Sequence, residues 1–468
     1  MCAIRREPGS YRDSRGFVFY DGDRVCRSVH RIAAADYEAI RDSGVIAESV
    51  RQRFLIPTAE SSGYSELRQQ VDGAYVLEHE RIPFISYPYE WCFRQLKLAA
   101  LHHLEYQMFL LSRDVMLRDA NAFNIQFIGS APIFIDLLSL APYREGEYWL
   151  GHMQFCRQFL NPLLLWSVVG VPPNPWLRGA LEGISSTATA KMLPYSSMLS
   201  WTILTHVFVQ ASLERRRAAK PEATLSSISS RRPLPKAAYK GLLEQLHRKI
   251  SKLSRKNSKD SIWEKYSQKN SYSETEESTK KSLVLNLVQN CRPSKVIDLG
   301  CNDGVYSNVA LGGGAGYAVG FDFDIEATDR AFQLSEQKQT NFLPLYVDLA
   351  NPSPAQGWME GERQGLRDRC RADLVIAFAV VHHLVIGRNI RIAEVVDWIT
   401  SIAPVGLIEF VPKTDPVIPI MLALRDEEPV EYTEELLITE LNRRVEITEK
   451  TRLDPSGRTI FSFRRLGL

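Results

Sequence analysis

The chain has 468 residues, of which 45% are hydrophobic and 24% are charged, as is usual for globular proteins. Collagen-like, mucin-like and disulfide-scaffold classes are excluded, because the chain has only 27 glycines, 24 prolines and seven cysteines. At about 100–200 residues per domain, the length predicts two or three domains. The absence of any Cys-x-x-Cys pair favours reduced thiols and a cytoplasmic location, and the apolar stretches are too interrupted to predict a membrane span.

The first 214 residues carry signals of an α+β domain. Residues 16–29 are predicted to form a hairpin around Asp21-Gly22, and residues 91–111 a long helix. After the helix comes Arg118-Asp119, with Asn124 five residues on and Asp136 at the end of an apolar run. This pattern resembles the catalytic core of protein-kinase-like phosphotransferases. The resemblance implies that Asp119 is the base and that Asn124 and Asp136 are metal ligands.

Three departures from the kinase pattern change the prediction for this domain. No lysine precedes Lys97, no glycine-rich loop is present to cover phosphates, and Asp136 is followed by two leucines instead of Phe-Gly. We therefore predict a degenerate kinase-like recognition domain over residues 1–214. The alternatives are an active kinase and an unrelated fold in which Asp119 caps a helix or turn.

Residues 215–260 are predicted to be a basic linker rich in serine and proline. Residues 215–259 hold 14 lysines and arginines against two acids, although the whole chain has a net charge of only +2. Apolar residues at helical spacing over 242–253 predict one amphipathic basic helix. It either binds an anionic partner, such as nucleic acid or lipid head groups, or packs its apolar face against a domain.

Strand and helix signals alternate in residues 261–468. Five apolar runs are predicted strands: 295–299, 318–321, 343–347, 374–379 and 405–410. Continuous apolar strands separated by helices, such as the one expected over 390–402, predict a parallel sheet covered on both faces. Residues 444–448 and 459–464 are expected to form a hairpin. The predicted class is therefore α/β, with a Rossmann-like sheet closed by an antiparallel hairpin.

Acidic residues and glycines follow the first three strands of this predicted sheet. The first strand leads into Asp298-Leu299-Gly300-Cys301-Asn302-Asp303-Gly304, where the glycines allow a tight turn and close approach of a ligand. The second ends at Asp322, whose carboxylate could accept both hydroxyls of a ribose, with Asp324 as its rival. The third is followed by Asp348. Acids at such an edge disfavour a pyrophosphate and favour a cationic nucleoside.

Together these residues resemble class I S-adenosylmethionine-dependent methyltransferases over 261–468. The resemblance implies S-adenosylmethionine as cofactor and a Rossmann-like methyltransferase domain. Its implied cofactor-binding residues are Asp298, Gly300, Cys301, Asn302 and Gly304 for the methionine part, Asp322 for the ribose, and Asp348 with Leu349 for the adenine. The two-part arrangement also resembles methyltransferase-like proteins linked to host-specific nodulation in root-nodule bacteria.

The candidate catalytic residues follow the fourth and fifth strands. His382 or His383 could take a proton from an oxygen or nitrogen nucleophile, or the pair packs beside the cofactor. Glu409 either borders the substrate pocket or is a buried, paired acid. No metal ion is expected, because no clustered metal-ligand spacing stands out. The aromatic residues Trp263, Tyr266 and Tyr272 could cover the cofactor or dock the linker.

The sequence thus predicts a methyltransferase that acts on an unidentified small-molecule, glycan or macromolecular acceptor, through oxygen or nitrogen. If the nodulation resemblance holds, the acceptor lies on the pathway to an oligosaccharide signal. Two alternatives remain. An RNA-modifying methyltransferase would use the basic linker to hold nucleic acid, although this partner is not favoured. A non-catalytic scaffold would bind partners through its two domains.

Overall fold

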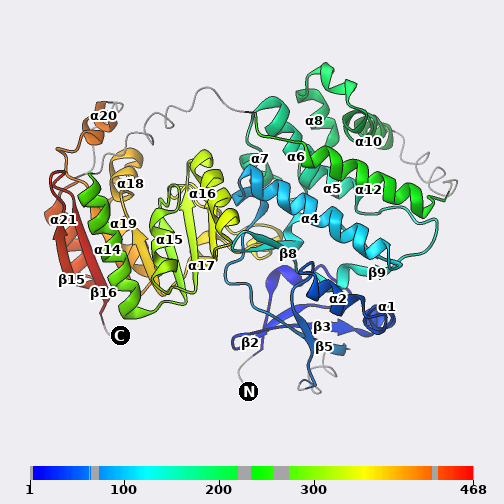
Figure 1. The fold of residues 1–468 in the computed structure, drawn as a ribbon, viewed down its shortest axis with the longest axis horizontal. Coiled ribbons are helices and arrows are strands. Elements are labelled where there is room, and N and C mark those ends of the chain that lie inside the picture. Colours follow the sequence, from blue (N-terminus) through cyan, green and yellow to red (C-terminus); the bar gives the residue numbers. More distant parts are fainter. Residues whose placement is uncertain are drawn as a thin grey trace. The chain divides into compact units, whose positions relative to one another are not determined.

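The computed structural model describes residues 4–62, 64, 73–219, 233–256, 273–423 and 431–466. The chain divides into two compact units (Figure 1). Unit 1 comprises Met1–Phe127, Pro132–Ser258 and Gln356–Arg363, and unit 2 comprises Ile128–Ala131, Lys259–Ala355 and Gln364–Leu468. Over the described residues, every helix is too short or too polar to cross a bilayer. The predicted lid residues 263–272 lie outside the described ranges.

Unit 2 is built on a seven-stranded sheet with the order β12-β11-β10-β13-β14-β16-β15. The first five strands in this order are parallel, and β16 and β15 are antiparallel to their neighbours. The strands are β10 (Lys295–Leu299), β11 (Tyr317–Asp322), β12 (Phe342–Tyr346), β13 (Leu374–Ala377), β14 (Val405–Phe410), β15 (Val445–Arg452) and β16 (Thr459–Arg465). The predicted parallel sheet and closing hairpin are therefore confirmed.

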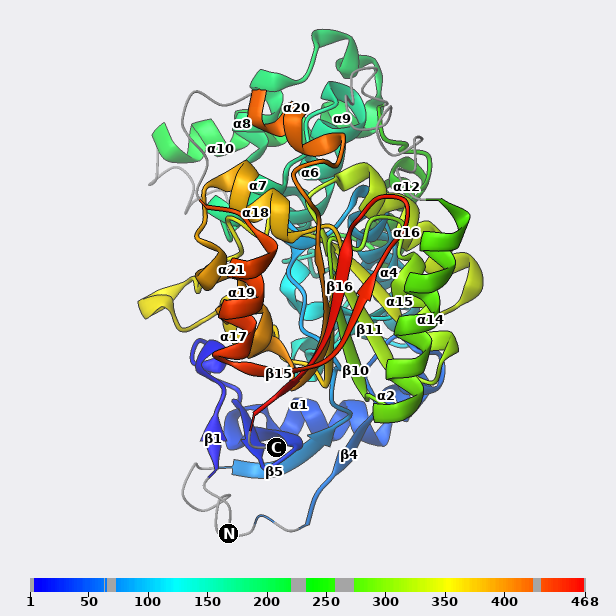
Figure 2. The ribbon, with the colours of Figure 1, turned by 90° about the vertical axis from the view of Figure 1, so that its left-hand side faces the viewer.

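The central strands are apolar because helices cover both faces of the sheet. In Figure 2, α14, α15 and α16 lie on one side, and α17, α19 and α21 on the other. The helices of unit 2 are α14 (Glu274–Cys291), α15 (Val305–Gly312), α16 (Ile325–Lys338), α17 (Leu366–Arg369), α18 (Val381–Arg388), α19 (Ile392–Ile402), α20 (Val417–Ala423) and α21 (Glu434–Asn442). The helix expected over 390–402 begins at Ile392, and its apolar positions, including Val395 and Ile399, are buried.

The N-terminal part of unit 1 is an antiparallel sheet with two helices, in the order β1-β2-β3-β5-β4. Its elements are β1 (Arg5–Arg6), β2 (Val18–Asp21), β3 (Arg24–His30), α1 (Arg31–Asp42), α2 (Val45–Arg51), β4 (Thr58–Glu60) and β5 (Gly73–His79). The hairpin predicted over 16–29 is β2–β3, which pairs Val18 with Arg27 and turns at Gly22 with φ +60°.

Helices and two short strand pairs make up the rest of unit 1. The long helix predicted over 91–111 is α4 (Phe93–Leu111), and the strand pairs are β6 (Val115–Leu117) with β9 (Leu140–Pro142) and β7 (Ile125–Ile128) with β8 (Ala131–Phe134). The further helices are α5 (His152–Phe155), α6 (Asn161–Leu164), α7 (Asn174–Gly179), α8 (Ser186–Met192), α9 (Trp201–Ile203), α10 (Gln210–Ala219) and α12 (Lys236–Ser251). Three π-helical segments interrupt them: η5 (Cys156–Leu160), η6 (Leu165–Val169) and η8 (Leu204–Val209).

The basic amphipathic helix lies within the predicted linker, yet it packs inside unit 1. This helix, α12, contacts α4 and buries Tyr239, Leu243, Leu246 and Ile250. Gln107 of α4 donates a hydrogen bond to the Tyr239 hydroxyl at 2.6 Å. Unit 1 therefore extends to Ser258, beyond the predicted boundary at 214. The buried apolar face agrees with the alternative in which this helix packs against a domain, within the described residues of 215–260.

Candidate functional site

The turn after β10 is shaped by glycines with left-handed backbone. Gly300 has φ +70° and Gly304 has φ +78°, a region that favours glycine. A Cβ on Gly304 would lie 2.3 Å from Cε1 of Phe342. Asn302 also has positive φ, at +46°, while the Cys301 side chain is buried. The positive φ angles therefore favour glycine at both positions of the predicted turn. At Gly304 a side chain would also clash with Phe342.

Asp298 is buried at the end of β10, where its carboxylate accepts a hydrogen bond from the Ser307 hydroxyl at 2.7 Å. Burial raises the pKa of Asp298 to about 7. The side chain is only 1% exposed, so a carboxylate here is held partly protonated near neutral pH. Its ionised form would gain from a neighbouring positive charge.

Asp322 joins the first turn to the end of β11. One carboxylate oxygen accepts the backbone N–H of Asn302 at 2.8 Å, and the other accepts the backbone N–H of Asp324, also at 2.8 Å. Burial raises the pKa of Asp322 to about 6. Asp324 instead caps α16 and accepts the backbone N–H groups of Glu326 and Ala327. Capping uses one oxygen of Asp324, so the choice between Asp322 and Asp324 for a ribose stays a prediction.

Asp348 follows β12 and is linked to α18. One carboxylate oxygen accepts the backbone N–H of Ala350 at 3.0 Å, and the other lies 3.1 Å from a guanidinium nitrogen of Arg388, the last residue of α18. Leu349, next in the chain, is half-buried. The candidate residues of the first three strands thus gather at the carboxyl edge of the sheet. There the strand order reverses between β10 and β13, which is where ligands of open α/β sheets bind.

His382 and His383 lie in the first turn of α18, with ring centroids 4.2 Å apart. Burial lowers the pKa of His383 to about 4 and that of His382 well below its usual value. His382 is buried and His383 is half-buried. Both imidazoles are therefore neutral at neutral pH, the form that can accept a proton.

Glu409 on β14 is fully buried among charged groups. Its carboxylate lies 2.7 Å from Nζ of Lys280, a residue of α14 that is also fully buried, and 3.6 Å from a guanidinium nitrogen of Arg458. Its other oxygen accepts the backbone N–H of Ala379 at 2.7 Å. A second guanidinium nitrogen of Arg458 pairs with Asp415 at 2.8 Å. Of the two roles predicted for Glu409, this geometry favours the buried, paired structural acid over the catalytic residue, because both carboxylate oxygens already have partners.

The residues present fit a cationic nucleoside such as S-adenosylmethionine. Gly300 carries no side chain, so a ligand can approach the backbone of the turn at this position. The acids Asp298, Asp322 and Asp348 offer acceptors for ammonium, hydroxyl and amino donors, and they would repel a pyrophosphate. The donor set therefore agrees with the predicted cofactor class.

One aromatic residue at this edge was missed by sequence reasoning. The Phe323 ring is 43% exposed, directly after Asp322, and lies 6.3 Å from the His383 ring. An exposed phenylalanine between two site acids offers a flat apolar face to a base. The pattern Asp322-Phe323-Asp324 could have drawn attention to it, because the ring lies between two acidic residues at the end of a predicted strand.

A second constellation forms within unit 1, where Asp119, Asn124 and Asp136 converge. The Asn124 amide donates to Asp119 at 3.1 Å and to Asp136 at 3.3 Å. Ser139 also donates to Asp119, and burial together with Asp136 raises the pKa of Asp119 to about 6. Arg27 of β3 pairs with Asp136 at 2.7 Å. Sequence reasoning missed this arginine because it sought a lysine.

No protein-family model matches the chain. Among solved structures, similarity is found to the N-methyltransferase NodS from Bradyrhizobium japonicum WM9 (14% identity, 41% of this chain and 97% of that one, TM-score 0.31). Similarity is also found to the magnesium protoporphyrin IX methyltransferase ChlM from Synechocystis PCC 6803 with bound S-adenosylhomocysteine (16% identity, 45% and 90%, TM-score 0.30). Likenesses at these TM-scores decide nothing about this chain, and the kinase-like interpretation of residues 1–214 stays a prediction.

A curated relative matches nearly the whole chain. The nodulation protein NoeA from Rhizobium meliloti (strain 1021) is 43% identical over 462 residues, which cover 98% of this chain and 96% of that protein. An identity this high over the full length of both proteins shows common descent of both units. The chain therefore belongs to the family of the nodulation protein NoeA.

Proposed function

We propose that unit 2 binds S-adenosylmethionine at the carboxyl edge of β10, β11 and β12 and transfers its methyl group to an oxygen or nitrogen acceptor. The observation that carries this proposal is the position of Asp322. Its carboxylate is bonded to the backbone of both the first turn and the end of β11. It is thereby oriented at the carboxyl edge of the sheet, next to β10 and its switch point, where a ribose would bind.

Each part of the cofactor has a counterpart among the residues of this edge. The turn from Gly300 to Gly304 would hold the methionine part, with Asp298 facing its ammonium group. Asp322 would accept the ribose hydroxyls. Asp348 would accept from the adenine amino group, with Phe323 and Leu349 against the base. The bound sulfonium supplies an activated methyl group, so the protein has mainly to position the acceptor.

His383 is the proposed base. It is less buried than His382, and its neutral imidazole can take a proton from a hydroxyl or amine as the acceptor attacks. His382 would position His383 through their ring contact. Glu409 would help to position the two histidines through the backbone. Its carboxylate accepts the backbone N–H of Ala379, three residues before His382.

The acceptor is proposed from the name of the relative, a nodulation protein. We infer a small-molecule or glycan acceptor in the making of a nodulation signal, with unit 1 as a degenerate kinase-like domain that recognises it. The pairing of Asp136 with Arg27 supports the degenerate assignment, because this pair neutralises a carboxylate that a metal ion would need. The buried face of α12 makes an RNA substrate the weaker alternative.

The test compares two neighbouring acids in the full-length protein. Asp322→Asn should reduce the affinity for S-adenosylmethionine by tenfold or more, because an amide cannot accept both ribose hydroxyls while keeping its two backbone bonds. Asp324→Asn is the matched control, since asparagine also caps helices well, and should bind as the wild type does. Loss of binding in Asp324→Asn alone would transfer the ribose role to Asp324, and unchanged binding in both variants would contradict the proposed site.

A further inference from the structure

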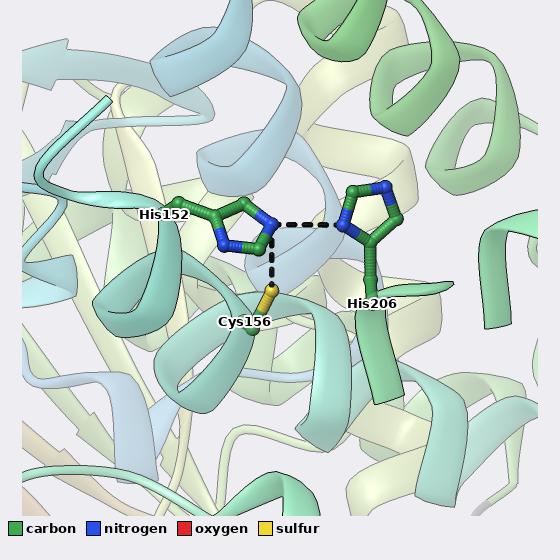
Figure 3. Close-up of side chains that lie close together, drawn as sticks. All are labelled: His152, Cys156 and His206. Carbon is green, nitrogen blue, oxygen red and sulfur yellow. Dashed lines mark hydrogen bonds between the residues drawn. The ribbon is translucent and has the colours of Figure 1, made fainter. Parts of the chain in front are cut away.

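Three side chains that bind soft metal ions converge in the helical part of unit 1. His152 of α5, Cys156 of η5 and His206 of η8 point toward one another (Figure 3). One ligand atom from each residue lies within 4.8 Å of the other two. His152 and Cys156 are neighbours on one helical stretch, whereas His206 comes about 50 residues later in the sequence. The fold therefore brings the cluster together.

The distances are close to those of a tetrahedral zinc site. Nε2 of His152 lies 2.8 Å from Nδ1 of His206 and 3.6 Å from Sγ of Cys156. With zinc bonds of about 2.3 Å to sulfur and about 2.1 Å to nitrogen, tetrahedral ligands lie roughly 3.6 Å (N to S) and 3.4 Å (N to N) apart. The distance from Sγ of Cys156 to Nε2 of His152 already fits, and Sγ lies within 4.8 Å of the His206 nitrogen. The two imidazoles would have to separate by about half an ångström, a small side-chain movement.

The two imidazoles present ring nitrogens to each other. Nε2 of His152 and Nδ1 of His206 lie 2.8 Å apart, and an imidazole nitrogen that carries no hydrogen can bind a metal ion. In the metal-free protein, one hydrogen lies between Nε2 of His152 and Nδ1 of His206. One of these nitrogens therefore donates the hydrogen bond and the other accepts it.

The local backbone is also unusual for a simple packing role. Cys156 and His206 both lie in π-helical segments, which are rare in proteins and frequent at functional sites. Trp149 packs against His152, with ring centroids 5.7 Å apart, and Phe155 packs against Trp149. This apolar surround would limit the access of bulk solvent to a thiolate–metal bond.

We propose that His152, Cys156 and His206 form a binding site for a zinc ion, which ties α5 and η5 to η8 within unit 1. The fourth position would be taken by water. Binding forms one zinc–sulfur and two zinc–nitrogen bonds, and the single proton that leaves the Cys156 thiol passes to solvent. The site is independent of the proposed methyltransferase activity of unit 2.

The sequence alone predicts no metal ion, so this site departs from that prediction. The signal available in the sequence is His152 and Cys156 at positions i and i+4, which places both on one face of a helix. His206 lies too far along the chain for its participation to be seen without the fold.

The experiment uses the full-length protein without an affinity tag. We expect close to one zinc per chain by elemental analysis, and removal of zinc by a chelator should lower the melting temperature. Cobalt added to the metal-free protein should produce a thiolate-to-cobalt absorption band. Calorimetry in buffers of different ionisation enthalpy should show one proton released per zinc bound.

Variants separate coordination from packing. Cys156→Ser should lose the zinc and the cobalt band, whereas Cys26→Ser, a second buried cysteine of unit 1, should keep both. If Cys156→Ser does not fold, the cobalt titration of the wild-type protein still shows whether a thiolate binds the metal. Less than a tenth of an equivalent of zinc together with no thiolate–cobalt band would overturn the proposal, as would binding of copper but not zinc.

Discussion

The carboxylate of Glu409 accepts a hydrogen bond from the backbone N–H of Ala379 at 2.7 Å, so β14 holds the turn that follows β13. Ala379 has φ +50°, a conformation that non-glycine residues adopt at a cost. The same carboxylate pairs with Lys280 of α14. A buried ion pair thus stabilises a strained turn directly before His382 and His383, and Glu409 acts on the site through the backbone.

The first prediction concerns this pair. Glu409→Gln should destabilise the protein by about 3 kcal/mol, because it leaves the ammonium of Lys280 buried without its partner charge. Burial already lowers the pKa of Lys280 to about 8, against the opposing effect of Glu409. Without Glu409 this pKa falls further, so the variant should gain stability as pH rises toward the usual lysine value. Denaturant unfolding at several pH values measures this.

The double variant Glu409→Gln with Lys280→Met is the control for that prediction. It removes both charges and should recover much of the lost stability. A single variant that unfolds like the wild type would contradict the structural role of Glu409.

The second prediction concerns pH and Asp298. The folded-state pKa of about 7 lies above the usual value of 3.8. The ligand-free protein therefore loses stability as pH rises through that interval, and the loss is complete above about 7. Asp298→Asn keeps an acceptor for Ser307 and removes this effect. It should stabilise the ligand-free protein by on the order of 1 to 3 kcal/mol above pH 7, and bind S-adenosylmethionine more weakly.

Thermal unfolding of the wild type and of Asp298→Asn over a range of pH tests this prediction, and the data at low pH serve as the reference. Near pH 4 both side chains are neutral, so the two curves should converge. A constant difference at every pH would show that the substitution acts through packing instead of ionisation.

The third prediction compares two glycines of unit 2. Gly304→Ala should destabilise the protein by about 2 kcal/mol or more and weaken cofactor binding, because its φ is +78° and the new Cβ would meet Phe342. Gly312→Ala, at the end of α15 with open space around its Cβ, should be neutral or stabilising by up to about 1 kcal/mol. Equal unfolding midpoints for the two variants would contradict the turn geometry.

The fourth prediction separates the two histidines. His383→Asn should lower kcat by about 100-fold or more with little change in cofactor affinity. His382→Asn should have a smaller effect on kcat, since that ring is buried behind His383. Because the pKa of His383 is about 4, the wild-type rate should show no inflection near the usual histidine value of about 6.5. An inflection there would argue for a different base.

Strand pattern and turn chemistry made the core of unit 2 predictable. Lys295–Leu299 and Val405–Phe410 match their predicted strands to the residue, because fully buried parallel strands are continuous apolar runs. The predicted third strand ends one residue late, since β12 ends at Tyr346, although the backbone N–H of Val347 still donates to the carbonyl of Asp322 on β11. Boundaries of this kind depend on hydrogen bonds that the apolar pattern does not reveal.

Contacts between distant segments could not be predicted. Arg27 meets Asp136 only because β3 folds over the strands that follow α4, and His206 meets Cys156 only through helix packing. Glu409 had two predicted roles, and only its burial beside Lys280 distinguishes them. Charged side chains at strand ends look alike in a sequence, whether they face a ligand or a partner inside the core.

The most direct test of the account is calorimetric titration of the full-length protein with S-adenosylmethionine and S-adenosylhomocysteine, repeated with ATP and magnesium. The account predicts one site per chain for both adenosyl compounds, with affinity that weakens as pH falls through about 7 and then about 6 and protonates first Asp298 and then Asp322. It also predicts no binding of ATP with magnesium. Binding of ATP alone would move the activity to unit 1, and binding of neither compound would contradict the proposed methyltransferase.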